Sequence, residues 1–333
     1  MLCHRQSSGY RGARGYTLVE LLVVLLIAGL LIATALPVAA TMLDDARTRE
    51  ASRTLNAYFA MAKARAVATG RPCALWMELD PDSPTRQVTQ CYLAESPPLY
   101  GGNSLPAARA WVEGNVLTFQ DSEEMAYLSG LVSTGETILV RFDYKGDWFS
   151  FTYDGTNFNY VGSSLNTTLP PGQPANPSAP NAGRPFQVLR LPKRIGSAYE
   201  LTPGTAIDLT HSGYGISDTQ FANTQSRLMV VFSPTGSVTK VMRLRDPYST
   251  EPSGTKFEMV DPPATIHFLV GRIEKTGEIG PNSNLADPTS LWVSVGAATG
   301  VVVTSENMPD PADPTNVAIA REAASSREQM GGR

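Results

Sequence analysis

The longest apolar stretch of the chain lies near its N-terminus. From Leu21 to Leu43 the sequence contains 23 residues without a charged side chain. A helix of this length extends about 34 Å at ~1.5 Å per residue, which is enough to cross a hydrocarbon core of about 30 Å. The pattern therefore predicts the membrane-spanning half of a helix at residues 16–43.

The same helix is expected to continue beyond the apolar stretch, as an amphipathic half at residues 44–72. Gly70 offers a left-handed cap and Pro72 prevents continuation, so the helix is predicted to end at Thr69. Apolar residues recur there at three- and four-residue steps and form one face of an otherwise polar helix, namely Ala51, Leu55, Tyr58, Ala62 and Ala66.

From Cys73 onward the pattern changes to short runs with strand character, separated by turn signals. One pair of runs flanks Asp154-Gly155, which is a strong hairpin signal. Closely spaced hairpins of this kind predict an antiparallel β-rich domain at residues 73–304. The expected fold class is α+β, with a long N-terminal helix packed on an antiparallel sheet.

Two segments have a composition unsuited to a packed core. Residues 162–185 are rich in Pro, Asn, Ser and Gly, and we expect an insertion within one sheet domain, although a linker between two domains also fits. Residues 305–333 begin rich in Pro and Asp and end in a charged, weakly helical stretch. We expect this tail to be disordered.

The charge pattern indicates how the chain is oriented in a membrane. Residues 1–15 contain three arginines and no acid, whereas Asp44 and Asp45 directly follow the apolar stretch. Basic residues favour the cytoplasmic side, so the bulk of the chain is expected outside the cytoplasm. A cleaved secretory signal peptide has a shorter apolar core, and a plain signal anchor gives no reason for Glu20, a carboxylate at the start of the apolar run.

The residues at the boundary carry a recognisable motif. Gly15 is followed by Tyr16-Thr17-Leu18-Val19-Glu20, and Pro37 lies 21 residues after Tyr16. This segment resembles the type IV prepilin processing motif, although phenylalanine is more usual than Tyr16 at its position. The resemblance implies that residues 1–15 are a leader peptide, that prepilin peptidase cuts between Gly15 and Tyr16, and that Tyr16 is then N-methylated. A proline inside a helix removes one hydrogen bond, so Pro37 is expected to kink it.

The resemblance also suggests a role for Glu20. Cleavage creates a cationic amine on Tyr16 in a layer of low dielectric, and the carboxylate of a neighbouring subunit's Glu20 is expected to neutralise it during filament assembly. The alternative is a carboxylate that merely reaches the lipid headgroups.

A second resemblance is to the GspH/FimT group, the H-type minor pseudopilins of type II secretion and their pilus relatives. It rests on residues 62–72, AKARAVATGRP, and on two later segments, 232–237 and 298–302. Members of that group are much shorter, so about half of this chain lies beyond the resemblance. It implies a structural minor pseudopilin of a type II secretion pseudopilus, whose partners are prepilin peptidase, other pseudopilins or pilins and the inner-membrane assembly platform. The expected location is the inner membrane, with a single pass, a cytoplasmic N-terminus and a periplasmic bulk.

A minor pilin that binds DNA or another ligand at a type IV pilus tip is the alternative. Without the leader's three arginines, 24 Lys and Arg face 31 Asp and Glu, so the net charge is −7 and nucleic-acid binding is not favoured. Two pairs of basic residues could still form a local basic patch, namely Lys193 with Arg194 and Arg243 with Arg245.

No pattern indicates an enzyme, a cofactor or a metal. His211 and His267 have no neighbouring acid or cysteine pattern, and we expect ordinary surface or half-buried histidines. A C-terminal set of oxygen ligands suggests calcium, as in major pseudopilins, but three prolines interrupt it and a solvated tail is favoured; the set is Glu306, Asp310, Asp313 and Asn316.

The cysteines suggest one covalent link. Cys73 and Cys91 lie equally far from Asp82, the centre of the turn in the first hairpin, so a symmetric hairpin places them opposite each other. Opposed Cβ atoms ~4.5–5.5 Å apart need little adjustment for a disulfide. The expected extracytoplasmic location also favours oxidation. Two free cysteines on neighbouring strands are the alternative.

Overall fold

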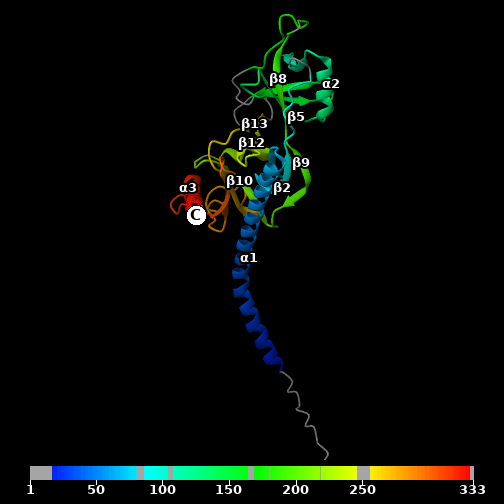
Figure 1. Cartoon of the computed structure of the whole chain (residues 1–333). Helices are drawn as coiled ribbons and strands as arrows, with labels where there is room; N and C mark the ends of the chain where they lie inside the picture. The colour runs from blue at the N-terminus through cyan, green and yellow to red at the C-terminus, as the bar shows by residue number, and fades with distance from the viewer. Residues whose placement is uncertain are drawn as a thin grey trace, which may run out of the picture. The chain divides into compact units, whose positions relative to one another are not determined.

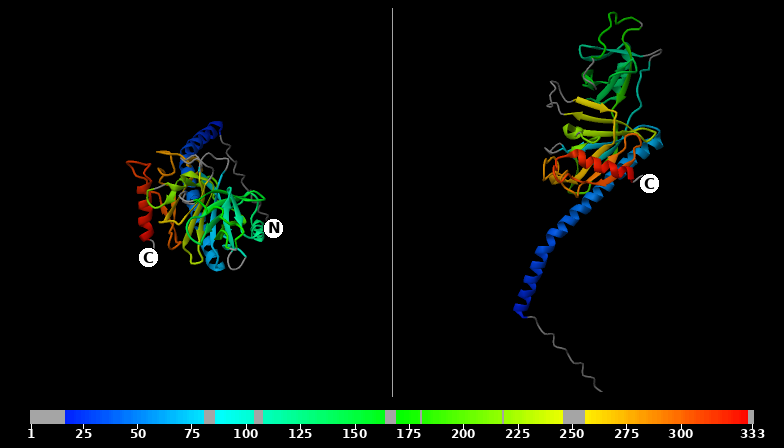
Figure 2. Two further views of the ribbon diagram at one scale, coloured as in Figure 1. Left: turned by 90° about the horizontal axis from the view of Figure 1, so that it is seen from above. Right: turned by 90° about the vertical axis from the view of Figure 1, so that its left-hand side faces the viewer.

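The computed structural model of the chain describes residues 17–80, 86–103, 108–163, 169–179, 181–217, 219–245 and 256–330. The chain divides into two compact units, with the boundary between Ala46 and Arg47. Figures 1 and 2 show the elements of both. The first unit holds the beginning of a long helix, and the second holds all the strands.

Helix α1 (Leu18–Thr69) contains 52 residues and crosses that boundary. It ends where the sequence predicted, because Gly70 adopts a left-handed φ of +64° and Pro72 follows two residues later. From Ala51 onward one face of α1 is buried against the sheet. The predicted amphipathic half is therefore the part of the helix that belongs to the second unit.

The described strands form two antiparallel sheets, so the fold class is α+β. The larger has ten strands in the order β13-β12-β11-β1-β2-β10-β14-β15-β16, and β9 also pairs with β2. Its strands are β1 (Cys73–Leu79), β2 (Gln87–Glu95), β9 (Lys193–Glu200), β10 (Thr205–Tyr214), β11 (Thr224–Phe232), β12 (Val238–Arg245), β13 (Lys256–Val260), β14 (Ile266–Arg272), β15 (Leu291–Val295) and β16 (Val302–Glu306). Short 3-10 helices, η1 (Gln220–Asn223) and η2 (Ile273–Lys275), connect some of them.

The second sheet closes into a small barrel in the order β3-β4-β7-β6-β5-β8. The whole barrel is inserted in the sequence between β2 and β9 of the larger sheet. Its elements are β3 (Arg109–Glu113), β4 (Val116–Phe119), helix α2 (Ser122–Leu131), β5 (Thr137–Phe142), β6 (Phe149–Tyr153), β7 (Phe158–Ser163) and β8 (Arg184–Arg190). It has its own aromatic core, which includes Phe151, Phe158 and Phe186.

The insertion is thus much larger than the polar stretch predicted at residues 162–185. That stretch lies inside the barrel, where it connects β7 to β8. Part of it is held by the barrel wall, since the Val112 amide donates to the Pro171 carbonyl at 2.9 Å and Ala182 is buried. The sequence prediction found the loop and missed the second β core around it.

Both faces of the ten-stranded sheet are covered. Alternate residues of a strand point to opposite faces, so on β1 Leu75 and Met77 pack against α1 while Ala74 and Trp76 face the other way. On that other face, Leu139 of β5 and Leu191 after β8 pack against β1 and β11. Figures 1 and 2 show the barrel beside the β12–β13 end of the sheet.

The prediction of a disordered tail at residues 305–333 is wrong for most of that segment. Residues Val317–Met330 form helix α3, which packs Ala320 and Ala324 against Trp292 of β15. The side chain of Arg321 is fully buried, and it donates to the backbone carbonyls of His211 at 2.7 Å and Gly215 at 3.1 Å. This polar helix packs through small alanines and through an arginine bound to backbone carbonyls. The composition of the segment therefore does not indicate that it packs on the sheet.

Candidate functional site

Helix α1 begins with a reciprocal pair of side-chain caps. The Thr17 amide and hydroxyl each donate to Oε2 of Glu20 at 2.9 Å, and the Glu20 amide donates to the Thr17 hydroxyl at 3.2 Å. This arrangement is a capping box, in which two otherwise unpaired amides of a first helical turn are satisfied. Glu20 therefore has a local role that the sequence analysis missed, although the Thr-x-x-Glu spacing was visible.

The other predicted processing residues can be placed only in part. Gly15 and Tyr16 lie outside the described residues. Position 37 lies within the helical range of α1, but the Pro37 side chain is outside the described part, and the predicted kink stays a prediction.

The first unit presents an extensive apolar surface. Large side chains exposed there include Leu18, Val19, Leu21, Leu22, Val23, Val24, Leu25, Leu26, Ile27, Leu30, Leu31 and Ile32. An apolar surface of this extent is typical of a segment that contacts lipid or another protein. Within the part of the chain that the structure describes, no helix has the length and apolar character needed to span a membrane.

A shallow groove runs between α1 and the edge strand β16. Its volume is about 540 Å³. The helix contributes Ala60, Ala64 and Ala68, at four-residue steps, and residues 300–302 form the opposite wall. Because alanine side chains are short, another helix can approach the backbone of α1 closely here. The groove is a candidate contact surface on the second unit.

A comparison with protein-family models identifies the N-terminus. Residues 10–36 match the prokaryotic N-terminal methylation motif, which includes Glu20 and the residues on both sides of the expected cleavage site. The chain is a type IV pilin-like protein of the prepilin type. Neither the curated proteins nor the solved structures contain a match to the chain.

A prepilin-type N-terminus has direct consequences for this chain. The motif implies a substrate of prepilin peptidase, a membrane-anchored N-terminus and assembly into a filament of pilin-like subunits. Proteins with this motif are structural rather than enzymatic. Helix α1 and the capping box at its start are therefore the candidate functional site.

The predicted disulfide between Cys73 and Cys91 is wrong, because both cysteines are free and buried. The paired residues of β1 and β2 place Cys73 opposite Glu95 and Cys91 opposite Met77. The hairpin is therefore centred two residues later than Asp82, and its register also shifts at a bulge between Glu78 and Leu79. Burial raises the pKa of the Cys91 thiol to about 12, so this thiol stays protonated and unreactive.

Three members of the two basic pairs are matched with acidic side chains. Nζ of Lys193 lies 3.5 Å from the Glu136 carboxylate, and the Arg194 guanidinium lies 2.5 Å from that of Glu78. Arg243 forms an ion pair with Glu258. The side chain of Arg245 is outside the described part. Acidic partners reduce the attraction that these cations exert on a phosphate backbone.

The C-terminal acids cap local turns. Asp310 Oδ1 accepts from the Ala312 amide at 2.9 Å, and Asp313 Oδ1 accepts from the Thr315 amide at 3.0 Å. Asn316 accepts from the Ala318 amide at 3.1 Å, at the start of α3. Among the described residues, no group of three or more His, Cys, Asp or Glu side chains is arranged to hold a metal ion.

Both histidines considered in the sequence analysis are buried, not surface or half-buried residues. The His267 ring is bonded through Nδ1 to the Ser294 hydroxyl at 2.8 Å, and His211 Nε2 lies 3.1 Å from the Glu278 carbonyl. Burial, with a smaller effect from the Arg321 charge, lowers the pKa of His267 to about 3. The neutral ring of His267 belongs to the packing beneath α3.

Proposed function

We propose that the chain is a minor pseudopilin of a type II secretion pseudopilus. The main support is the N-terminal methylation motif, which is followed directly by helix α1. The second half of this helix packs against the β-sheet of the second unit. The resemblance of residues 62–72 to the GspH/FimT group supports the choice of the secretion filament. The uncharged run at residues 21–43 and the basic leader support a single pass with the bulk in the periplasm.

The groove on α1 suggests how subunits contact one another. We infer that the helix of a neighbouring filament subunit occupies it. The exposed side of α1 in this groove is formed by Ala60, Ala64 and Ala68. Their small side chains permit close helix packing. The exposed apolar face of the first unit then packs against equivalent segments in the membrane and in the filament.

Processing is tested by Gly15→Val, because a β-branched side chain in place of hydrogen obstructs the peptidase cleft. We expect cleavage of the variant to fall to background, whereas Gly12→Val, a matched change within the leader, is cleaved normally. Intact-mass measurement with and without co-expressed prepilin peptidase provides the readout. In the wild-type protein, an uncut N-terminus at Met1 in the presence of the peptidase, or cleavage after Ala33 or Ala35, would contradict the proposal.

The choice of filament is tested by deleting the gene from its own host and complementing it. We expect the deletion to reduce export of secreted proteins into the medium, with surface pili and DNA uptake retained. Wild-type protein should restore export, and the Gly15→Val variant should not. Loss of pili or of DNA uptake with normal export would replace the proposal by the alternative, a type IV pilus minor pilin.

A further inference from the structure

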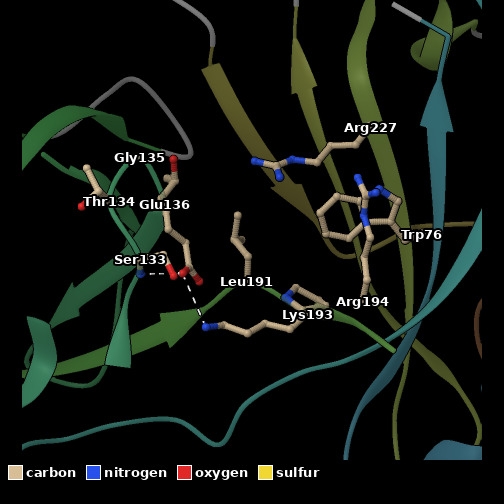
Figure 3. A pocket seen from close by; sticks show the side chains of 11 residues that line it. Trp76, Ser133, Thr134, Gly135, Glu136, Leu191, Lys193, Arg194 and Arg227 are labelled. Atoms are coloured by element: carbon tan, nitrogen blue, oxygen red, sulfur yellow. Dashed lines mark hydrogen bonds and ion pairs between the residues drawn. The ribbon is translucent and has the colours of Figure 1, made fainter. Parts of the chain in front are cut away.

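A cavity of about 410 Å³ lies where the barrel meets the sheet. Figure 3 shows its wall. On the barrel side the wall consists of residues 133–137, which lead into β5. Residues 191–194 follow β8 and include the start of β9. On the sheet side the wall consists of Trp76 of β1 and Arg227 of β11. Four separate segments of the chain therefore converge on one space.

Arg227 forms no ion pair among the described residues, although the more distant carboxylates of Glu78 and Glu136 act on its charge. Its guanidinium lies over the Trp76 ring, 5.1 Å from the centroid, and its Nε is buried without a hydrogen-bond acceptor. Burial and the nearby charge of Arg194 lower the pKa of Arg227. A half-buried guanidinium in this state is stabilised by an added anion that accepts its N–H groups.

Trp76, a residue of the cavity wall, carries a second donor that is not used. Its side chain is only 6% exposed, and its indole Nε1–H has no hydrogen-bond acceptor within the described part of the chain. An indole N–H can only donate. A buried donor without an acceptor costs roughly 1–3 kcal/mol, so the environment of this N–H is sensitive to an acceptor bound nearby.

The neighbouring charges are already matched with each other. Arg194 is bonded to Glu78 and is held between the rings of Trp76, at 4.5 Å, and Tyr92, at 4.4 Å. Glu136 faces Lys193 and also accepts from the Ser133 amide at 3.0 Å, as the dashed lines in Figure 3 show. Three cations and two carboxylates leave a surplus of one positive charge, located at Arg227.

We propose that this cavity binds one carboxylate of a peptide segment from another protein, with the Arg227 guanidinium as the donor and the Trp76 ring beside it. The single surplus charge matches one carboxylate, whereas the nearby Glu78 and Glu136 repel a polyanion such as a nucleic acid. Leu191, Pro192 and the Trp76 ring provide apolar contacts for the aliphatic part of an acidic residue. The site does not depend on which filament the chain joins.

The test follows the indole N–H resonances of the full-length protein in detergent micelles. The chain contains four tryptophans, and Trp76→Phe assigns the Trp76 signal. The probe is the dipeptide acetyl-Leu-Asp-amide, with acetyl-Leu-Asn-amide as its uncharged counterpart. We expect a saturable shift of the Trp76 signal with the Asp peptide, and affinity at least tenfold weaker for the Asn peptide. Arg227→Gln should abolish the shift, whereas Arg184→Gln, which removes an exposed arginine of the barrel, should retain it.

Three results would overturn the proposal. They are the absence of a saturable shift in the wild-type protein, equal binding of the two dipeptides, and a stronger response of the Trp76 signal to a single-stranded oligonucleotide than to the Asp peptide. The comparison of the two dipeptides uses only wild-type protein, so it decides the question even if Arg227→Gln fails to fold. The resonances of the other three tryptophans report whether that variant has folded.

Discussion

Replacing Phe59 by alanine is expected to lower the free energy of unfolding by about 3–5 kcal/mol, as for other large core aromatics cut to alanine. Phe59 is fully buried on the sheet-facing side of α1. Its ring stacks on Phe268 of β14, with 5.4 Å between centroids, and meets the edge of Phe232 of β11 at 6.3 Å. The truncation leaves a cavity. Strands β11 and β14 cannot move in to fill it without breaking the hydrogen bonds to their neighbours in the sheet.

Met61 provides the matched control for Phe59. It lies two residues later on the same helix and is 43% exposed, so Met61→Ala should change the free energy of unfolding by about 0.5 kcal/mol or less. Urea titration of the full-length protein in detergent, followed by circular dichroism, measures both variants. Equal losses for the two would mean that α1 is not anchored to the sheet through this face.

The sequence predicted this helix well because its signals are local. Four of the five residues assigned to the apolar face, Ala51, Leu55, Ala62 and Ala66, are buried, and the helix ends at Thr69 as expected. The prediction placed Tyr58 on that face, whereas Tyr58 is half-buried and its neighbour Phe59 fills the centre. Steps of three and four residues both fit a helical face, so periodicity alone does not choose between adjacent positions.

The hairpin predicted at Asp154-Gly155 is confirmed, since β6 and β7 pair up to Tyr153 and Phe158. The Asp154 side chain accepts from the Thr156 and Asn157 amides at 2.8 and 2.7 Å. Because these bonds are local, the turn can be predicted from the sequence. Closure of the barrel cannot be predicted from the local sequence, because it requires β3 to pair with β8, more than seventy residues later. Long-range pairing of this kind has no local signature.

The wrong disulfide has a similar cause. A symmetric turn was assumed in the first hairpin, and a shift of two residues in its centre moves Cys91 from Cys73 to Met77. Strand register depends on the length of the turn and on bulges, here at Glu78, as much as on the residues of the strands. The cavity at Trp76 and Arg227 was equally hidden, because its residues come from strands that pair across the fold.

Glu20→Ala and Glu20→Gln are both expected to be cleaved by prepilin peptidase and inserted in the membrane, yet to enter filaments poorly. Loss of one partner from a desolvated ion pair costs about 3–5 kcal/mol, which corresponds to a decrease of roughly a hundredfold or more in incorporation. In the filament proposed above, that partner is the amine of a neighbouring subunit's Tyr16. The readout is the ratio of filament to membrane-bound subunit after shearing, measured by quantitative immunoblot.

The glutamine variant separates the two roles of Glu20. Its amide oxygen still accepts from the Thr17 amide and hydroxyl, so the capping box at the start of α1 is kept while the charge is lost. The alanine variant loses both, and loss of a cap alone costs only about 1 kcal/mol. Glu50→Gln, an exposed charge removed further along the same helix, is the control and should assemble normally. If Glu20→Gln assembles like wild type while Glu20→Ala does not, the carboxylate acts through the helix cap and the intersubunit charge pair is excluded.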